Sequence, residues 1–159
     1  MIRQARFVHT NLIARNWRTL AAFYIEAFGC TFVPPERSFS GSALEAGTGV
    51  AGAVLTGVHL RLPGFSADEA PTLEIFHYSQ LAPAVPPAVN RPGFGHIAFS
   101  VASVVEARQE VLRLGGKPLG EIVELPVGGG GGRRVTWCYV SDPEGNIIEL
   151  QSWNPPAGG

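Results

Sequence analysis

The chain has 159 residues, of which 45% are apolar, so it can form one domain with a sizeable core. Its formal net charge of −1 excludes the strongly basic surface typical of nucleic-acid-binding proteins. Its apolar runs fall far short of the roughly 20 residues that cross a bilayer, so we expect no membrane partner. Cys30 and Cys138 form no C-x-x-C pair and no secretory signal is visible, which together indicate reduced thiols in a cytoplasmic protein.

An internal repeat organises the chain. The first copy starts at His9 and the second at His96, and each passes from strand-like alternation into helical apolar spacing. Each copy then reaches a glycine 20 positions after its histidine, Gly29 in the first and Gly116 in the second. The copies are offset by 87 residues, so the two halves of the chain are nearly equal.

The first half is predicted to contain strands, one helix and a short helical turn. Asn16 is the expected N-cap of the helix, whose apolar stripe includes Trp17, Leu20, Tyr24 and Ile25. In chain order the elements are a strand at Arg6–Leu12, the helix up to Gly29, a strand at Cys30–Val33, a turn at Ser42–Ala46, and strands at Ala53–Leu62 and Pro71–Ser79.

The second half predicts the same order. Ser103 is the expected N-cap of its helix, and Glu106 three positions later completes a capping-box pattern. The elements are a strand at Gly95–Val101, the helix up to Gly115, and strands at Lys117–Leu125, Arg133–Ser141 and Asn146–Trp153, with a turn at Asp142–Asn146 before the last strand.

Each half therefore has the order βαβββ, and the fold class is α+β. A proline-rich segment, Leu81–Pro92, separates the copies and is typical of a linker. We expect a first module over residues 1–80, the linker over 81–92 and a second module over 93–159. Together they are predicted to form one structural domain, in which strands of both modules curl around a shared cleft.

Four side chains in these strands point to metal chemistry. Strand alternation places His9 and His96 on one face of the first strand of each half, and Glu74 and Glu149 on one face of the last. A carboxylate in an apolar strand is costly to bury unless it is paired or bound to a metal. Imidazole and carboxylate together suit one divalent ion of zinc, nickel, cobalt, iron or manganese.

Alternative interpretations exist for single residues of these kinds. A lone strand histidine is usually structural, and a lone strand glutamate usually faces solvent; recurrence of the same pair in both copies argues against this for the four residues above. His59 and His77 lack such a counterpart, so we assign both to structural roles. Trp137 and Tyr139 are expected mainly to pack, and the glycine run Gly128–Gly132 to be a hairpin connection or a lid over the cleft.

The sequence resembles the vicinal oxygen chelate superfamily, which includes glyoxalase I, methylmalonyl-CoA epimerase, fosfomycin-inactivating thiol transferases, bleomycin-binding proteins and extradiol dioxygenases. The motifs that carry the resemblance are HTNLIARNWRTLAAFYIEAFG, PTLEIFHYS, GFGHIAFSV and VSDPEGNIIELQSW. The resemblance implies two βαβββ modules that form a U-shaped barrel around a metal, with His9, Glu74, His96 and Glu149 as ligands. This full set of four most resembles glyoxalase I.

The resemblance implies a glyoxalase-like lyase or isomerase. In such enzymes a divalent ion binds two vicinal oxygens of a small-molecule substrate, and a proton moves through an enediolate or enolate. Glu149 is then expected to be the main base, and Glu74 to shuttle the proton on the other face. The alternatives are a metal-dependent dioxygenase or thiol transferase, or a metal-free drug-binding protein of the bleomycin type. A homodimer is expected, with the site within one chain or shared between two.

Departures from the glyoxalase I pattern concern the substrate. Ile13, Tyr78 and Pro92 stand where those enzymes place arginine, asparagine and arginine to hold glutathione, and Arg91 is adjacent to the last of these positions. The pattern therefore disfavours glutathione while leaving the metal ligands intact. The candidate substrate-binding residues lie on the ligand faces or at these positions, and they are Phe7, Asn11, Phe76, Tyr78, Arg91 and Trp153.

Overall fold

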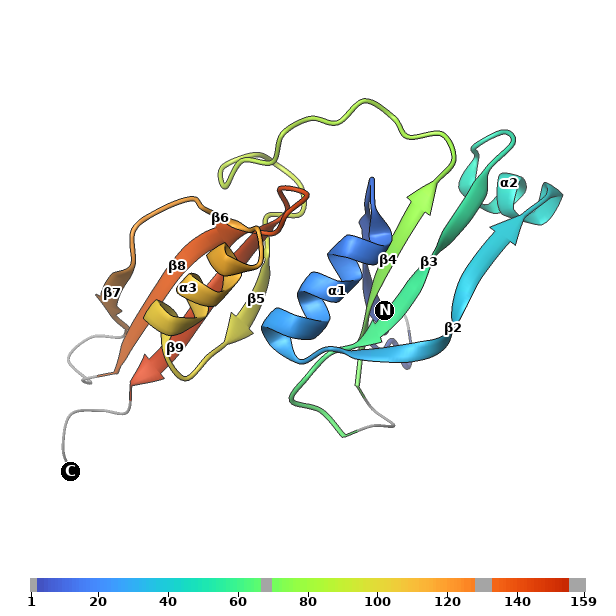
Figure 1. The fold of residues 1–159 in the computed structure, drawn as a ribbon. Helices are drawn as coiled ribbons and strands as arrows, with labels where there is room; N and C mark the ends of the chain where they lie inside the picture. The colour runs from blue at the N-terminus through green and yellow to red at the C-terminus, as the bar shows by residue number, and fades with distance from the viewer. Residues whose placement is uncertain (1–2, 67–69, 128–132, 155–159) are drawn as a thin grey trace. The chain divides into compact units, whose positions relative to one another are not determined.

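The chain forms two compact units, each built around its own β-sheet (Figure 1). A computed structural model describes residues 3–66, 70–127 and 133–154. The units are Met1–Ala84 and Val85–Gly159, so the division falls inside the proline-rich segment. In the described part of the chain, no helix is long and apolar enough to span a membrane.

The first unit contains a four-stranded sheet in the order β1-β4-β3-β2. Strands β1 and β4 are parallel, whereas β3 pairs antiparallel with both β4 and β2. In chain order the elements are β1 (His9–Ile13), α1 (Trp17–Phe28), β2 (Thr31–Ser40), α2 (Ser42–Thr48), β3 (Val54–Arg61) and β4 (Thr72–Tyr78). This confirms the predicted βαβββ order, with β2 extending well beyond the predicted Cys30–Val33 and the helical turn extending to Thr48.

Helix α1 begins and ends where the sequence predicts. The Asn16 side chain accepts a hydrogen bond from the backbone N–H of Thr19, and Gly29 adopts the left-handed conformation that ends the helix. The buried face differs from the predicted stripe at one edge. Phe23 is buried and Ile25 is exposed, because the Phe23 ring packs edge-on against Tyr24.

The second unit repeats this arrangement with a five-stranded sheet, in which α3 packs against β8 and β9 (Figure 1). The strand order is β5-β9-β8-β6, and β7 also pairs with β8. Its elements are β5 (Ile97–Ser100), α3 (Val104–Arg113), β6 (Lys117–Pro118), β7 (Val123–Pro126), β8 (Arg134–Ser141) and β9 (Ile147–Asn154). Ser103 caps α3 through the backbone N–H of Glu106, as the capping-box pattern predicts.

The single strand predicted at Lys117–Leu125 is wrong, because the structure has two strands there. Pro118 pairs with Val140 and Val123 pairs with Trp137, so four residues of this segment face two residues of β8. The two extra residues interrupt the ladder that this segment forms with β8, so β6 and β7 are separate strands. The α+β fold of two βαβββ modules is confirmed nonetheless.

In both sheets one face packs against a helix and the other is open. Buried apolar side chains fill the helix-covered faces, among them Leu60, Leu73 and Ile75 in the first unit and Val140, Ile148 and Leu150 in the second. Strand alternation therefore sends the residues between them to the open faces. Cys30 and Cys138 are free and buried, and burial raises the pKa of the Cys30 thiol to about 11.

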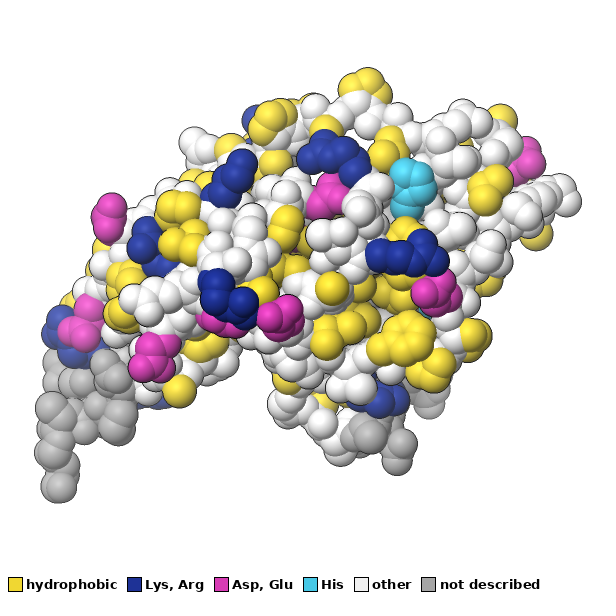
Figure 2. All heavy atoms as spheres, in the orientation of Figure 1, with side chains coloured by type: hydrophobic (Ala, Val, Ile, Leu, Met, Phe, Trp, Pro, Cys, Tyr) yellow, Lys and Arg dark blue, Asp and Glu magenta, His cyan; other side chains and the backbone are white. Residues whose placement is uncertain are grey.

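Figure 2 shows basic, acidic and hydrophobic side chains interspersed on the face it presents. The charges on this face do not gather into a patch of one sign.

Gly57 on β3 makes room for an aromatic ring on the open face of the first sheet. It lies directly opposite Phe76 of β4, and a Cβ atom at Gly57 would lie 2.5 Å from Phe76 Cδ1. The same atom would also lie 2.8 Å from the Cα of Phe76. The Phe76 ring in turn contacts Phe39 and His59, with ring centroids 6.4 and 5.7 Å away. A side chain at Gly57 would therefore displace this group of rings.

The substitution Gly57→Ala is expected to lower the free energy of unfolding by about 2–3 kcal/mol, because the added methyl group overpacks the sheet. Urea unfolding followed by circular dichroism measures this. Gly47→Ala is the matched control, since a Cβ there meets nothing within 4 Å and the residue lies in a helix. Equal stability of the Gly57→Ala protein and the wild type would contradict the packing described.

Candidate metal centre

The first unit brings His9 and Glu74 together on its open face. Strands β1 and β4 pair in parallel with Asn11 opposite Glu74, so His9 is the diagonal neighbour of Glu74 two residues before Asn11. His9 Nδ1 lies 3.4 Å from Glu74 Oε1. The Glu74 side chain is only 14% exposed, so its carboxylate depends on such partners.

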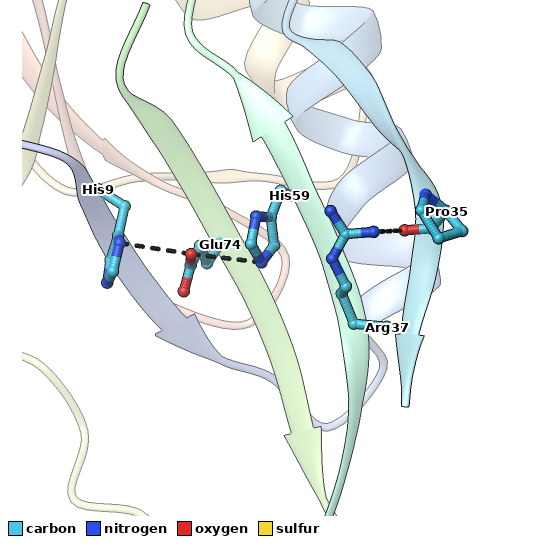
Figure 3. Close-up of polar contacts among 5 residues, drawn as sticks. All are labelled: His9, Pro35, Arg37, His59 and Glu74. Atoms are coloured by element: carbon cyan, nitrogen blue, oxygen red, sulfur yellow. Dashed lines mark hydrogen bonds and ion pairs between the residues drawn. The ribbon is translucent and has the colours of Figure 1, made fainter. Parts of the chain in front are cut away.

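A second imidazole meets the same carboxylate from the other side. His59 of β3 lies directly opposite Glu74 in the antiparallel ladder, and its Nε2 is 3.3 Å from Glu74 Oε1. Figure 3 shows His9, Glu74 and His59 on three adjacent strands with their side chains turned toward one another. His59, which the strand pattern alone assigns to a structural role, thus contacts a predicted metal ligand.

Several charges act on His59. Burial is the largest cause and lowers the pKa of His59, while the carboxylate of Glu74 acts in the opposite direction. The positive charges of Arg37 and His9 lower the pKa of His59 further. The net result is a pKa below the ordinary value for histidine, which favours the neutral imidazole near pH 7.

The second unit brings His96 and Glu149 together in the same way. Ala98 of β5 lies opposite Glu149 of β9, and His96 precedes Ala98 by two residues. His96 Nε2 lies 3.0 Å from Glu149 Oε2. Tyr139 of β8 lies directly opposite Glu149, and its ring centroid is 5.1 Å from that of His96.

The two pairs occupy equivalent positions in the two sheets. In each unit the histidine stands two residues before the residue that pairs with the glutamate; His9 is the first residue of β1, and His96 directly precedes β5. His59 and Tyr139 are also equivalent, because each lies opposite the glutamate on the neighbouring antiparallel strand. The internal repeat of the sequence therefore places a histidine, a glutamate and a residue opposite that glutamate at the same register positions in each sheet.

Each histidine–glutamate pair fits a shared metal ion in donor chemistry and in spacing. Two ligands that lie about 2.0–2.2 Å from one ion are roughly 2.8–3.6 Å apart at octahedral to tetrahedral angles. The observed N···O distances of 3.4 Å and 3.0 Å agree with this. Among the described residues, no group of three or more His, Cys, Asp or Glu side chains is arranged to hold an ion, so each unit supplies a pair.

Most of the predicted substrate-binding residues of the first unit lie near its pair. Asn11 is exposed on β1, directly opposite Glu74, and Phe7 is 64% exposed just before that strand. Tyr78 ends β4 and is partly buried. Phe76 is only 4% exposed because Phe39 and His59 pack against it, so little of its ring is accessible to a ligand.

In the second unit Trp153 lies on the open face, two residues beyond Gln151, whose side chain accepts a hydrogen bond from Trp153 Nε1. The Arg133 guanidinium lies 5.1 Å from the Trp153 ring centroid. Arg91 lies in the segment before β5, and its backbone N–H donates to the carbonyl oxygen of Ala88.

The remaining candidates divide between packing and the open face. His77 Nδ1 lies 3.0 Å from the carbonyl oxygen of Ala14, which supports the predicted structural role. Trp137 and Tyr139 pack against each other with centroids 4.9 Å apart, and Tyr139 also lies beside His96 and Glu149. The glycine run Gly128–Gly132 lies outside the described residues.

A family model for the glyoxalase/bleomycin resistance protein/dioxygenase superfamily matches residues 6–150. The chain belongs to this superfamily. The matched region contains both histidine–glutamate pairs, so the superfamily's two-module fold and the repeat found here coincide. A search of curated proteins finds no match.

Solved structures support this superfamily fold. A glyoxalase family protein from Bacillus cereus is 17% identical with a TM-score of 0.77, and the alignment covers 98% of this chain and 100% of that one. A superfamily enzyme from Burkholderia phytofirmans is 12% identical with a TM-score of 0.60, over 93% and 98% of the two chains.

A fosfomycin resistance protein from Listeria monocytogenes is 19% identical with a TM-score of 0.53, over 96% and 94% of the two chains. At these identities the three structures show the fold of the superfamily and leave its chemistry to the residues of each chain.

The position of Glu149 opposite Tyr139 predicts a measurable effect on the pKa of Tyr139. Burial is the largest cause that raises the pKa of Tyr139, followed by the charge of Glu149 and its hydrogen bond with the phenol. In chelator-treated protein, Glu149→Gln should therefore lower the pKa of Tyr139 toward its ordinary value. Ultraviolet absorbance of the phenolate against pH measures it, with Tyr139→Phe to identify the transition. A midpoint that stays the same or rises would contradict the contact.

Proposed function

We propose that this superfamily member is a metal-dependent, glyoxalase-like lyase or isomerase. The observation that carries the proposal is the recurrence of one histidine–glutamate pair at equivalent positions of both sheets, with N···O distances of 3.4 Å and 3.0 Å. Such pairs in apolar strands are expensive to maintain without a bound cation. The proposed reaction moves a proton beside two vicinal substrate oxygens, through an enediolate or enolate.

The proposed ligands are His9, Glu74, His96 and Glu149, two from each unit. Because each unit supplies only a pair, the proposal requires both pairs to act on one ion, within one chain or between the two copies of a homodimer. A bound divalent ion would supply Lewis acidity, which stabilises negative charge on substrate oxygens. Zinc, nickel, cobalt, iron and manganese all suit this donor set.

The two carboxylates are the proposed proton-transfer groups. Glu149 is proposed as the main base, which takes the proton from the substrate carbon, and Glu74 as the group that shuttles a proton on the other face. Both side chains are mostly buried, at 14% exposed for Glu74 and 19% for Glu149. This burial limits competition from water for the same proton.

The substrate is proposed to be a small molecule other than a glutathione conjugate. Ile13 on β1 is 47% exposed, which places an apolar side chain where the related enzymes use arginine. Phe7, Asn11, Tyr78, Arg91 and Trp153 are the proposed substrate contacts, while Phe76 packs against Phe39 and His59. Exposed aromatic surface of this kind favours a partly apolar substrate.

The test combines metal binding with proton exchange. Protein stripped with a chelator should bind one zinc, nickel, cobalt or manganese ion per chain in isothermal titration calorimetry. The loaded protein should exchange a substrate proton with solvent deuterium, with the hemithioacetal of methylglyoxal and methylmalonyl-CoA as probes. Glu149→Gln should reduce the exchange rate about 10²–10⁴-fold, because general-base catalysis contributes that much.

Glu121→Gln is the matched control, since Glu121 is exposed in the segment between β6 and β7. A Glu149→Gln protein that binds metal and exchanges protons at the wild-type rate would disprove the role of Glu149. A chain that binds no metal but binds apolar drugs would instead be a sequestering protein of the bleomycin type. Incorporation of dioxygen or transfer of a thiol by the loaded protein would indicate the other enzymatic alternatives.

A further inference from the structure

His59 is the one imidazole at the first carboxylate that the proposed ligand set does not use. It lies directly opposite Glu74 on β3, with its Nε2 3.3 Å from Glu74 Oε1. Its side chain is 26% exposed and packs edge-on against Phe76, with ring centroids 5.7 Å apart. Phe76 therefore supports the ring on one side. Figure 3 shows the ring directed at Glu74.

We infer that His59 is a positioning residue, which donates an Nε2–H hydrogen bond to Glu74 and holds that carboxylate in its metal-binding orientation. The part of this inference that concerns a metal rests on the proposed function. The hydrogen bond itself does not. An ionised carboxylate only accepts hydrogen bonds and has about four lone-pair sites, so it can accept from His59 and still bind an ion.

The repeat favours positioning over direct ligation. The nitrogens of His9 and His59 both approach the same atom, Glu74 Oε1, at 3.4 Å and 3.3 Å. Distance does not distinguish the two histidines, but the repeat does: the position of His9 is again a histidine in the second unit, His96, whereas the position of His59 is Tyr139. The residue type that recurs is assigned to the ion, and the residue type that differs is assigned to the carboxylate. Consistently, the described residues contain no three-donor group that could hold an ion.

The second unit supports the same role from independent residues. Tyr139 lies opposite Glu149 just as His59 lies opposite Glu74, and its ring packs beside His96 with centroids 5.1 Å apart. The residue type differs, yet both positions present a donor to the glutamate from the neighbouring antiparallel strand. A repeated donor at a repeated carboxylate is explained by a shared need to orient the two carboxylates.

The open face around His59 also limits where its ring can turn. Phe76 occupies the space over Gly57, two residues before His59 on the same face of β3. Arg37 of β2 lies opposite Gly57, and its Nη1 donates to the carbonyl oxygen of Pro35. The side chains of Phe76 and Arg37 offer no acceptor to the Nε2–H, whereas Glu74 Oε1 lies 3.3 Å from Nε2.

Two variants of His59 separate donation from packing. His59→Phe keeps a ring against Phe76 but removes the donor, and should weaken zinc or cobalt binding by about 10–100-fold, the usual loss for a partner of a metal ligand. His59→Gln keeps an N–H near the same place and should restore affinity to within about threefold of the wild type. Isothermal titration calorimetry on the full chain measures both.

His77→Phe is the matched control, since it removes a strand histidine that bonds the Ala14 carbonyl and lies away from the pair. It should leave metal affinity unchanged even if stability falls. The visible spectrum of the cobalt-loaded protein provides a second readout. His59→Gln should preserve the wild-type spectrum, because the ligands remain the same.

A third measurement does not need a metal. In chelator-treated protein, nitrogen-15 chemical shifts should show hydrogen on Nε2 of His59, and Glu74→Gln should change those shifts. Failure of the wild type to bind metal, with hydrogen on Nε2, would count against the proposed function and leave the hydrogen bond standing. A His59 ring with no hydrogen on Nε2 would overturn the inference.

Two binding results would also overturn it. Wild-type affinity in His59→Phe would show that the donor is unnecessary. Loss of affinity in both variants, together with an altered cobalt spectrum in His59→Gln, would show that His59 is itself a ligand.

Discussion

A carboxylate in an apolar strand needs a partner, and strand register decides which partner it meets. Glu74 and Glu149 both stand in strands whose neighbouring residues are fully buried, such as Ile75 and Leu150. Each carboxylate lies within 3.4 Å of a nitrogen of the histidine that stands two residues before its register partner. The candidate site therefore depends on the parallel pairing of β1 with β4 and of β5 with β9, since a slip of one residue would turn each histidine to the helix-covered face.

The same pairing connects core packing to the site. Gly57 leaves space for Phe76, Phe76 packs against His59, and His59 contacts Glu74. A packing change at one glycine can thus reach a proposed ligand through two side-chain contacts. Phe76 is nearly buried and still affects the candidate site, because it packs against His59. His59 in turn contacts the carboxylate of Glu74.

The fold of this chain is shared with solved structures at 12–19% identity, so it depends on strand order and on the buried helix-covered faces more than on individual residues. The two histidine–glutamate pairs lie on the opposite faces of the sheets, outside that core. The fold alone therefore does not specify the chemistry, which depends on the side chains of the open faces.

Local patterns in the sequence alone determined the internal repeat, the caps at Asn16 and Ser103, the face of each strand and the two histidine–glutamate pairs. These features depend on residues close together along the chain, where periodicity and capping chemistry act directly. Only the tertiary structure decided that His59 and Tyr139 lie opposite the glutamates, and that β6 and β7 are separate strands. Both depend on the register between distant segments, which no local periodicity specifies.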